Sequence, residues 1–375
     1  MTRYLYIHIP FCLRKCLYCD FYSVPFQAGA VGEYISSLHQ ELRLNKESAR
    51  DLRTLYMGGG TPTLLSVEEI AGVMDEARKV FSLDHDAEIT IEANPGTLTE
   101  AKLKGLRMAG INRISIGVQS LVDPELAVLG RIHKAEHASA AVGDARRAGF
   151  GNISVDLIYG VPGQTMKTWE YSLLKAIEGG PEHLSAYELT PERNTPLYGL
   201  LERGDIAMPD EELITDMYYL AVDILEERGY EQYEISNYAK PGFACIHNLN
   251  YWNRGEYLGI GAGAHSFIRG RRMGNAGDIS RYCEALGRNL SPVVEDVEIS
   301  GDAILEEIIF LGLRKTGGVE ISRLPDGERL MKNKAVEELV SHGLVETSGT
   351  FLRLTRKGLV LSNEIFLRLF QVYGC

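Results

Sequence analysis

The 375-residue sequence predicts an α/β fold, a partial (β/α)6 barrel followed by a smaller C-terminal α+β domain. Short runs rich in β-branched residues alternate with amphipathic, helix-like segments, so six βα units follow one another and imply parallel strands. Motifs with glycine or polar side chains occur at the ends of successive runs. Because such ends meet at one mouth in a barrel-type sheet, a curved sheet is favoured over a doubly wound one. The expected strands are residues 4–9, 54–57, 88–92, 113–118, 153–159 and 183–189.

The segments between these strands carry helix start and stop signals. Ser66 and Glu69 form a capping-box pattern at the start of one helix. Further helices are expected after Thr99, Thr165 and Asp210, each with apolar residues on one face and a glycine near its end. The glycines are Gly110, Gly179 and Gly229.

Beyond residue 235 the pattern changes. Residues 236–300 begin with a stretch rich in Asn, Tyr and Gly, whereas residues 301–375 predict a helix, a short helix, a helix and two β-like runs around Ser348-Gly349. The second pattern resembles a winged-helix module. We therefore expect a partial barrel over 1–235, a connecting region over 236–300 and a winged-helix-like domain over 301–375. The last part contains ten Lys and Arg against ten Asp and Glu, which argues against DNA binding.

The composition is that of a folded globular protein, with 45% hydrophobic and 24% charged residues. The formal charge of -12 argues against a nucleic-acid partner, because phosphate binding requires a basic surface. The sequence contains no apolar run long enough for a membrane span and no recognisable secretory signal. Three of the six cysteines lie within eight positions, and Cys245, Cys283 and Cys375 lie apart. This spacing is no disulfide framework, so we expect a cytoplasmic protein with free thiols at Cys283 and Cys375.

The clustered cysteines, Cys12, Cys16 and Cys19, have the spacing C-x3-C-x2-C without a fourth thiol nearby. A structural zinc site normally has four protein ligands, whereas a cubane iron-sulfur cluster held by three thiolates leaves one iron open. Three buried small residues or an incomplete zinc knuckle are the alternatives. The charged Arg14 and Lys15 between the cysteines favour an exposed, electropositive loop and therefore the cluster.

Six motifs occur in a fixed order along the chain. They are Tyr6-Ile-His-Ile-Pro-Phe-Cys12, Gly58-Gly-Gly-Thr-Pro-Thr63, Glu92-Ala-Asn-Pro95, Ile116-Gly-Val-Gln-Ser120, Arg131-Ile-His133 and Asp156-Leu-Ile-Tyr-Gly-Val-Pro162. With the cysteine spacing, this set resembles the radical S-adenosylmethionine (SAM) superfamily, specifically its coproporphyrinogen III dehydrogenase-like group. The resemblance implies a TIM-like partial barrel of the radical SAM type and a 4Fe-4S cluster on the three cysteines. In that family the open iron binds the amino and carboxylate groups of SAM, and the reduced cluster cleaves SAM to methionine and a 5'-deoxyadenosyl radical.

The resemblance also assigns contacts to SAM. Taken alone, the glycines would be a tight βα turn and the polar residues would be caps or surface ion pairs. Arg131 suits a carboxylate because its guanidinium is a planar fork, and His8 is expected to be structural. The implied SAM contacts are Tyr6, Tyr18, Gly59, Gly60, Thr61, Glu92, Gln119, Arg131 and Asp156.

Three features distinguish the chain from the dehydrogenases of this group. Those enzymes carry another cysteine two residues after the third, where this chain has Phe21, and they have a long extension before the cluster, where only eleven residues precede Cys12. The segment His247-Asn-Leu-Asn-Tyr-Trp252 matches the HNxxYW signature of the haem-chaperone branch. The resemblance therefore favours that branch.

Histidine is a common axial ligand of haem iron, and Tyr251 and Trp252 offer flat apolar surface to a porphyrin. We therefore predict His247 as a haem ligand, with Cys245 as the alternative. The expected function is that of a haem chaperone that binds a 4Fe-4S cluster, SAM and haem as cargo. Its expected partners are haem-accepting proteins and an electron donor for the cluster. Oxidative decarboxylation of coproporphyrinogen III and SAM-dependent methyl transfer are the enzymatic alternatives, and the sequence leaves open whether SAM is cleaved. The glycine-rich segment 259–266 lacks the features of a nucleotide loop and is expected to pack closely beside the barrel.

Overall fold

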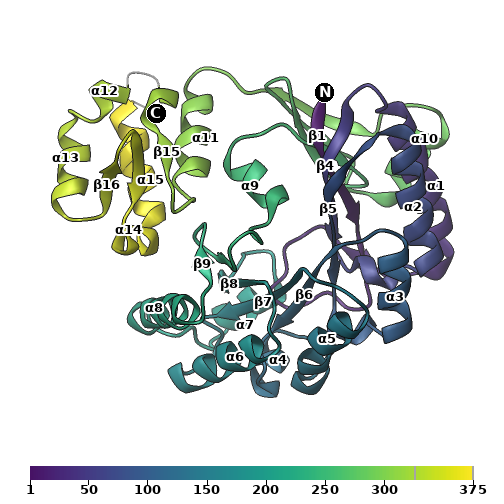
Figure 1. Cartoon of the computed structure of the whole chain (residues 1–375), viewed down its shortest axis with the longest axis horizontal. Coiled ribbons are helices and arrows are strands. Elements are labelled where there is room, and N and C mark those ends of the chain that lie inside the picture. Colours follow the sequence, from purple (N-terminus) through teal and green to yellow (C-terminus); the bar gives the residue numbers. More distant parts are fainter. Residues whose placement is uncertain (325–326, 374–375) are drawn as a thin grey trace.

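A curved nine-stranded sheet forms the centre of the molecule, as Figure 1 shows. The computed structural model describes residues 1–324 and 327–373. The strand order is β11-β1-β4-β5-β6-β7-β8-β10-β9, and the six strands from β1 to β8 in this order are parallel. The predicted parallel barrel strands are thus confirmed. They are β1 (Thr2–Ile9), β4 (Ala49–Gly59), β5 (Leu83–Ala93), β6 (Arg113–Gln119), β7 (Ile153–Tyr159) and β8 (His183–Glu188).

Helices cover the outer face of this sheet, and the predicted caps are present. Ser66 and Glu69 form the reciprocal capping box of α2. Thr99, Thr165 and Asp210 each accept a hydrogen bond from a backbone N–H in the first turn of the helix that follows. The helices are α1 (Ala28–Leu44), α2 (Val67–Val80), α3 (Glu100–Met108), α4 (Asp123–Val128), α5 (Ala135–Arg147), α6 (Met166–Glu178), α7 (Pro196–Glu202) and α8 (Glu211–Glu227).

The two faces of the sheet differ in polarity because successive side chains of a strand point to opposite sides. In β1, Leu5, Ile7 and Ile9 are buried in the main apolar core with the helices. Tyr6 and His8, at the alternating positions, face the inside of the barrel and make a hydrogen bond at 2.9 Å between their side chains. The inside of the barrel is therefore lined with polar groups.

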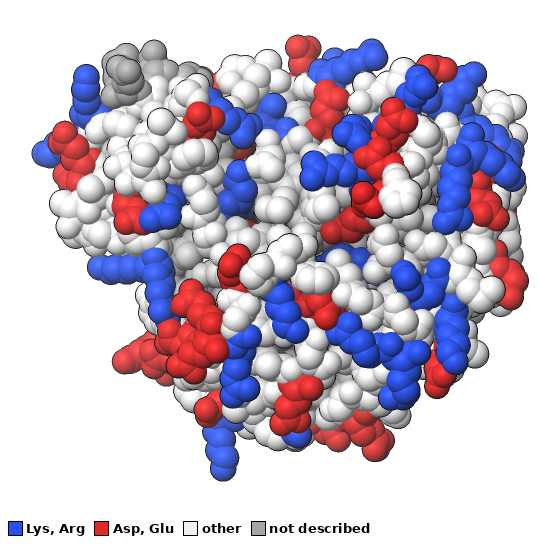
Figure 2. All heavy atoms as spheres, in the orientation of Figure 1, with Lys and Arg blue, Asp and Glu red and all other residues white. Residues whose placement is uncertain are grey.

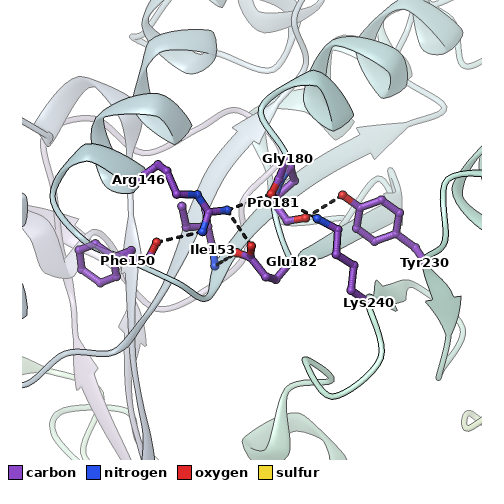
Figure 3. A network of polar contacts seen from close by, with 8 residues as sticks. All are labelled: Arg146, Phe150, Ile153, Gly180, Pro181, Glu182, Tyr230 and Lys240. Carbon is purple, nitrogen blue, oxygen red and sulfur yellow. Dashed lines mark hydrogen bonds and ion pairs between the residues drawn. The ribbon is translucent and has the colours of Figure 1, made fainter.

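A polar network joins the amino-terminal ends of β7 and β8 to α5 (Figure 3). Arg146 donates to the carbonyl oxygens of Phe150 and Gly180 at 3.0 and 2.9 Å and to Glu182 at 2.7 Å. The other oxygen of Glu182 accepts the N–H of Ile153 at 3.0 Å. Lys240 and Tyr230 contact the same turn through the carbonyl oxygens of residues 180 and 181. This network fixes the ends of two barrel strands opposite the carboxyl edge of the sheet.

Residues 236–300 supply strands to both sides of the main sheet. β10 (Asn237–Ala239) pairs antiparallel with β8 and with β9 (Glu231–Gln232), while β11 (Leu258–Ile260) pairs parallel with β1. The predicted boundary at residue 235 stays a prediction, although this range is structurally continuous with the barrel. The range also contains α9 (Ile246–Trp252), β12 (His265–Ile268), β13 (Arg271–Asn275), α10 (Ile279–Gly287) and β14 (Val293–Glu298).

The glycine-rich segment packs as closely against β1 as the sequence predicts. Gly261 has a φ of +111°, and a Cβ atom there would lie 2.6 Å from the carbonyl oxygen of His8. Only glycine fits such a close approach in this backbone conformation. Cys283 is buried in α10, and Cys375 lies outside the described residues.

The C-terminal module contains the predicted three helices and two strands in that order, but β15 lies between its first two helices, and α14 and α15 follow the strands. Its strands pair in the order β15-β17-β16, and the winged-helix assignment stays a prediction. It contacts the barrel through Glu307, which accepts hydrogen bonds from Arg254 at 2.7 Å and Arg272 at 2.8 Å. Its elements are α11 (Asp302–Gly312), β15 (Val319–Glu320), α12 (Gly327–Leu330), α13 (Lys334–Ser341), β16 (Val345–Ser348), β17 (Phe351–Leu354), α14 (Arg356–Val360) and α15 (Ser362–Tyr373).

Lys and Arg side chains are interspersed with Asp and Glu over the face of the molecule in Figure 2. Among the described residues, no helix is both long enough and apolar enough to cross a bilayer.

Candidate functional site

A cavity of about 470 Å³ opens at the carboxyl ends of the barrel strands. It is lined by eleven of the thirteen residues for which the sequence predicts a role in binding the cluster, SAM or haem. The exceptions are Tyr6 and His247. The lining residues among the predicted ones are Cys12, Cys16, Tyr18, Cys19, Gly59, Gly60, Thr61, Glu92, Gln119, Arg131 and Asp156.

The three clustered cysteines lie where β2 (Phe11–Cys12) leads into the following loop, and all three are partly exposed. Cys12 Sγ lies 3.8 Å from the hydroxyl of Thr61, and Cys16 Sγ accepts a hydrogen bond from Arg131 at 3.4 Å. Burial raises the pKa of Cys12, and it raises the pKa of Cys19 to about 11; the nearby Cys16 adds to both shifts. The three thiols are therefore close enough to influence one another and would release protons when they bind iron.

The arrangement of the three thiols on the wall of one cavity suits a cubane iron-sulfur cluster. In residues 1–324 and 327–373, no three His, Cys, Asp or Glu side chains lie close enough together to bind one metal ion. In a cubane, each thiolate binds a different iron, so three separated thiols on the wall of one cavity suit it.

The turn after β4 is held against the carboxylate of Glu92. The N–H of Gly59 donates to Glu92 Oε2 at 3.0 Å, and the hydroxyl of Tyr56 donates to Oε1 at 2.9 Å. Gly59 has a φ of +115°, and a Cβ atom there would lie 2.5 Å from the ring of His8. Burial raises the pKa of Glu92 to about 7. This carboxyl group can therefore exchange a proton near neutral pH when it binds an amine.

Gln119, at the end of β6, has a φ of +67°, a conformation that non-glycine residues rarely adopt and that is frequent at functional sites. The nearby Arg131 donates to the carbonyl oxygen of Gly117 at 2.6 Å, while its buried Nε has no hydrogen-bond partner within residues 1–324 and 327–373. Asp156 accepts hydrogen bonds from Ser185 at 2.7 Å and Ser115 at 3.0 Å, and burial raises its pKa. Arg131 thus retains a free donor beside the cysteines.

His247 lies inside the barrel, on α9, and does not reach the cavity. Its Nδ1 is 2.6 Å from the hydroxyl of Thr54, and its Nε2 is 2.8 Å from that of Tyr251. Burial lowers the pKa of His247 to about 3, with a contribution from the charge of Arg113. The imidazole is therefore neutral and both of its nitrogens are occupied. Ligation of haem by His247 stays a prediction, and it would require α9 to move.

Cys245, the alternative ligand, is also buried. Its thiol donates to Glu88 at 3.5 Å, and burial raises its pKa to about 12. In Figure 1, α9 lies on the concave side of the sheet, and within its HNxxYW segment His247 and Asn250 are buried. Tyr6 belongs to the same interior, where its ring stacks on that of Tyr56 at 6.2 Å.

Several cavity residues were not predicted from the sequence. A polar side chain at every second position of an otherwise apolar strand was the available signal, because such positions share one face. Arg113 and Ser115 in β6 show this pattern, as do His183 and Ser185 in β8. The missed residues include Arg113, Ser115, Ser154, His183, Ser185, Tyr187 and Asn248.

Comparisons with known proteins agree with this geometry. Residues 6–176 match the family model of the radical SAM superfamily, and residues 299–361 match that of the HemN C-terminal domain. The chain is 40% identical to the haem chaperone HemW of Bacillus subtilis, covering 96% of this chain and 97% of that protein. It is 34% identical to the mouse protein "Radical S-adenosyl methionine domain-containing protein 1, mitochondrial", covering 97% and 86% of the two chains.

The fold also matches a solved structure over almost its whole length. Coproporphyrinogen III oxidase (HemN) from Escherichia coli superimposes with a TM-score of 0.83, covering 98% of this chain and 89% of that chain at 23% identity. The protein therefore belongs to the radical SAM superfamily, in the HemW branch of the coproporphyrinogen III dehydrogenase-like group.

Proposed function

We propose that this protein is a haem chaperone that binds a 4Fe-4S cluster, SAM and haem and delivers haem to haem-accepting proteins. The observation that carries the proposal is the single cavity on which three cysteine thiols and the residues expected to contact SAM converge. The names of the relatives, haem chaperone HemW, favour haem as the cargo. We place the protein in the cytoplasm, with an electron donor for the cluster among its partners.

The chain's own residues have distinct roles in this proposal. Cys12, Cys16 and Cys19 would hold the cluster, which supplies an open iron for the amino and carboxylate groups of SAM. Glu92 would accept a hydrogen bond from the amino group, and Arg131 would donate to the carboxylate through its Nε. Together these residues orient the ligand at the cysteines.

Asp156 and Gln119 would hold the ribose of the same ligand. Both line the cavity beyond the cysteines, and the three serines around Asp156 keep its carboxylate in place. These residues would position the nucleoside but would not bind the cargo.

The test is anaerobic reconstitution with iron and sulfide, followed by titration with haem and measurement of the Soret band. We expect a saturable Soret shift and subsequent transfer of haem to apomyoglobin. Cys12→Ser should lose the visible absorption of the cluster, whereas Cys283→Ser, which changes a buried thiol outside the cavity, should retain it. A wild-type protein that produces no Soret shift, or that decarboxylates coproporphyrinogen III on addition of SAM and reductant, would refute the proposal.

A further inference from the structure

Arg113 is a buried cation in the wall of the cavity. It is the first residue of β6, and only 2% of its surface is exposed. Its Nε has no hydrogen-bond partner among the described residues, and the residue lines the cavity. Because nearly all buried polar groups in folded proteins are paired, this arrangement indicates a donor that is satisfied by something entering the cavity.

The carboxylates near Arg113 are hydrogen-bonded to other groups. Glu88 accepts the N–H groups of Ile246 and His247 at 3.0 and 3.1 Å and so caps α9. Asp156 accepts from the surrounding serines. Burial acts to lower the pKa of Arg113, but nearby groups, foremost Cys245 and Glu88, raise it above its ordinary value. The guanidinium therefore stays charged, and a buried charge is strongly stabilised by a directly hydrogen-bonded anion.

Arg113 lies nearer the amino-terminal end of the strands than Glu92, because Arg113 pairs with Thr90 of β5 whereas Glu92 pairs with Ser115 of β6. Arg131 lies beside the cysteines, since it donates a hydrogen bond to Cys16 at 3.4 Å. Arg113 shares the cavity wall with Ser154 and His183. Both ring nitrogens of His183 are hydrogen-bonded, to Ser154 and Tyr233 at 2.8 Å each, and burial lowers its pKa. The imidazole is thus neutral, and Arg113 supplies the positive charge of this wall.

We propose that Arg113 is a binding residue for a carboxylate group of a ligand in this cavity. The inference rests on the proposed function in one respect: haem carries two propionates, and a planar guanidinium binds such a carboxylate through two parallel hydrogen bonds. The carboxylate of SAM is the second source of the same chemistry. Because Arg131 lies nearer the cysteines and is expected to bind that group, the propionate is the favoured source.

The experiment removes the carboxylates of the ligand and the charge of Arg113, first separately and then together. Binding of haem and of its dimethyl ester, which lacks both carboxylates, is measured with the wild-type protein and with Arg113→Gln and Arg113→Lys. S-adenosylhomocysteine and S-adenosyl-3-thiopropylamine form the matched nucleoside pair, because the second lacks the carboxylate but keeps the amino group. Arg281→Gln, on an exposed part of α10, is the control for a change of net charge. Circular dichroism and thermal unfolding show whether each variant is folded.

We expect the wild-type protein to bind haem at least about tenfold more tightly than the ester, and Arg113→Gln to lose that preference. Arg113→Lys should retain part of it, because lysine keeps the charge but lacks the fork. If Arg113→Gln abolishes the preference for the carboxylate-bearing ligand only in the nucleoside pair, Arg113 binds the carboxylate of the nucleoside ligand and not a propionate of haem. This result would still support a carboxylate site at Arg113.

Unchanged preferences in both pairs would overturn the inference while leaving the proposed function intact. A wild-type protein without a Soret shift would instead refute the proposed function, and the nucleoside pair would then decide the role of Arg113. If Arg113→Gln does not fold, the comparison of each ligand pair on the wild-type protein and on Arg113→Lys gives the same decision.

Discussion

The Nδ1 atom of His247 lies 2.6 Å from the hydroxyl of Thr54, which joins α9 to the inner face of β4. The two residues are 193 positions apart, and both are buried. The contact makes the histidine of the HNxxYW segment part of the barrel interior.

Removing one partner of this buried pair should destabilise the protein. We expect Thr54→Val to lower the free energy of unfolding by about 1–3 kcal/mol, because the imidazole nitrogen loses its partner. Denaturant unfolding of the iron-free protein measures the change. Thr347→Val, at an exposed position of β16, should change it by no more than about 0.5 kcal/mol. Equal stabilities of Thr54→Val and wild type would show that the hydrogen bond contributes little.

A methyl group at Gly59 should damage the turn that contacts Glu92. Gly59→Ala would combine an unfavourable φ of +115° with a contact of 2.5 Å to His8, so we expect a loss of about 2–4 kcal/mol in stability and weaker SAM binding. Thermal unfolding and a SAM titration provide the two measurements. Gly163 has a φ of +82°, and a Cβ atom there would have no described residue other than its chain neighbours within 4 Å, so Gly163→Ala controls for backbone strain alone. If both variants behave alike, the contact with His8 has no effect.

The stability of the protein should depend on pH through Glu41. Its carboxylate accepts hydrogen bonds from Tyr282 at 2.6 Å, Gly261 at 2.8 Å and Asn275 at 2.6 Å, yet burial raises its pKa to about 7. Since the folded protein holds this proton more tightly than the unfolded chain does, the contribution to stability is fully present below about pH 4.5 and is lost as the pH rises through about 7.

The comparison of wild type with Glu41→Gln isolates this term. As the pH rises from 5 to 7.5, wild type should lose unfolding free energy relative to Glu41→Gln. The loss is about 1.4 kcal/mol for each unit by which the pKa of Glu41 in the folded protein exceeds that in the unfolded chain. Urea unfolding at a series of pH values provides the measurement. A difference that is constant over this range would mean that Glu41 titrates elsewhere.

Glu307 should hold the C-terminal module to the barrel. Its side chain and that of Arg254 are each only 16% exposed, so Glu307→Ala leaves a largely buried guanidinium without its carboxylate. We expect faster cleavage near residue 300 in limited proteolysis and a stability loss of about 1–3 kcal/mol. Asp223→Asn removes a more exposed ion pair with Arg356 between the same two parts and should have a small effect. Identical cleavage rates for all three proteins would contradict this role.

The sequence predicted the barrel strands and most of the cavity because both depend on local patterns. Ser66 and Glu69 specify a helix start within four residues. A glycine motif such as Gly58 to Gly60 indicates by itself that a strand ends there. The resemblance to a known superfamily then added roles for polar residues, such as Gln119, that local patterns leave undefined.

The interior of the barrel was harder to predict because it depends on contacts between distant residues. Arg113 follows a short turn, Gly110-Ile-Asn112, and resembles a surface residue at the start of a strand. His247 belongs to a short polar helix, and nothing local shows that Thr54 and Tyr251 occupy its two nitrogens. Burial of such groups follows from how α9 packs into the barrel, which a linear pattern does not encode.

The pairing of β11 with β1 and of β10 with β8 has a consequence for biosynthesis. A ribosome completes all six βα units before it makes either flanking strand. Until then, β1 and β8 are edge strands whose outer amide and carbonyl groups are unpaired. Exposed edge strands pair with other polypeptides and so promote aggregation. We expect fragments that stop at residue 235 to aggregate during expression, whereas fragments extended to residue 300 should stay dispersed.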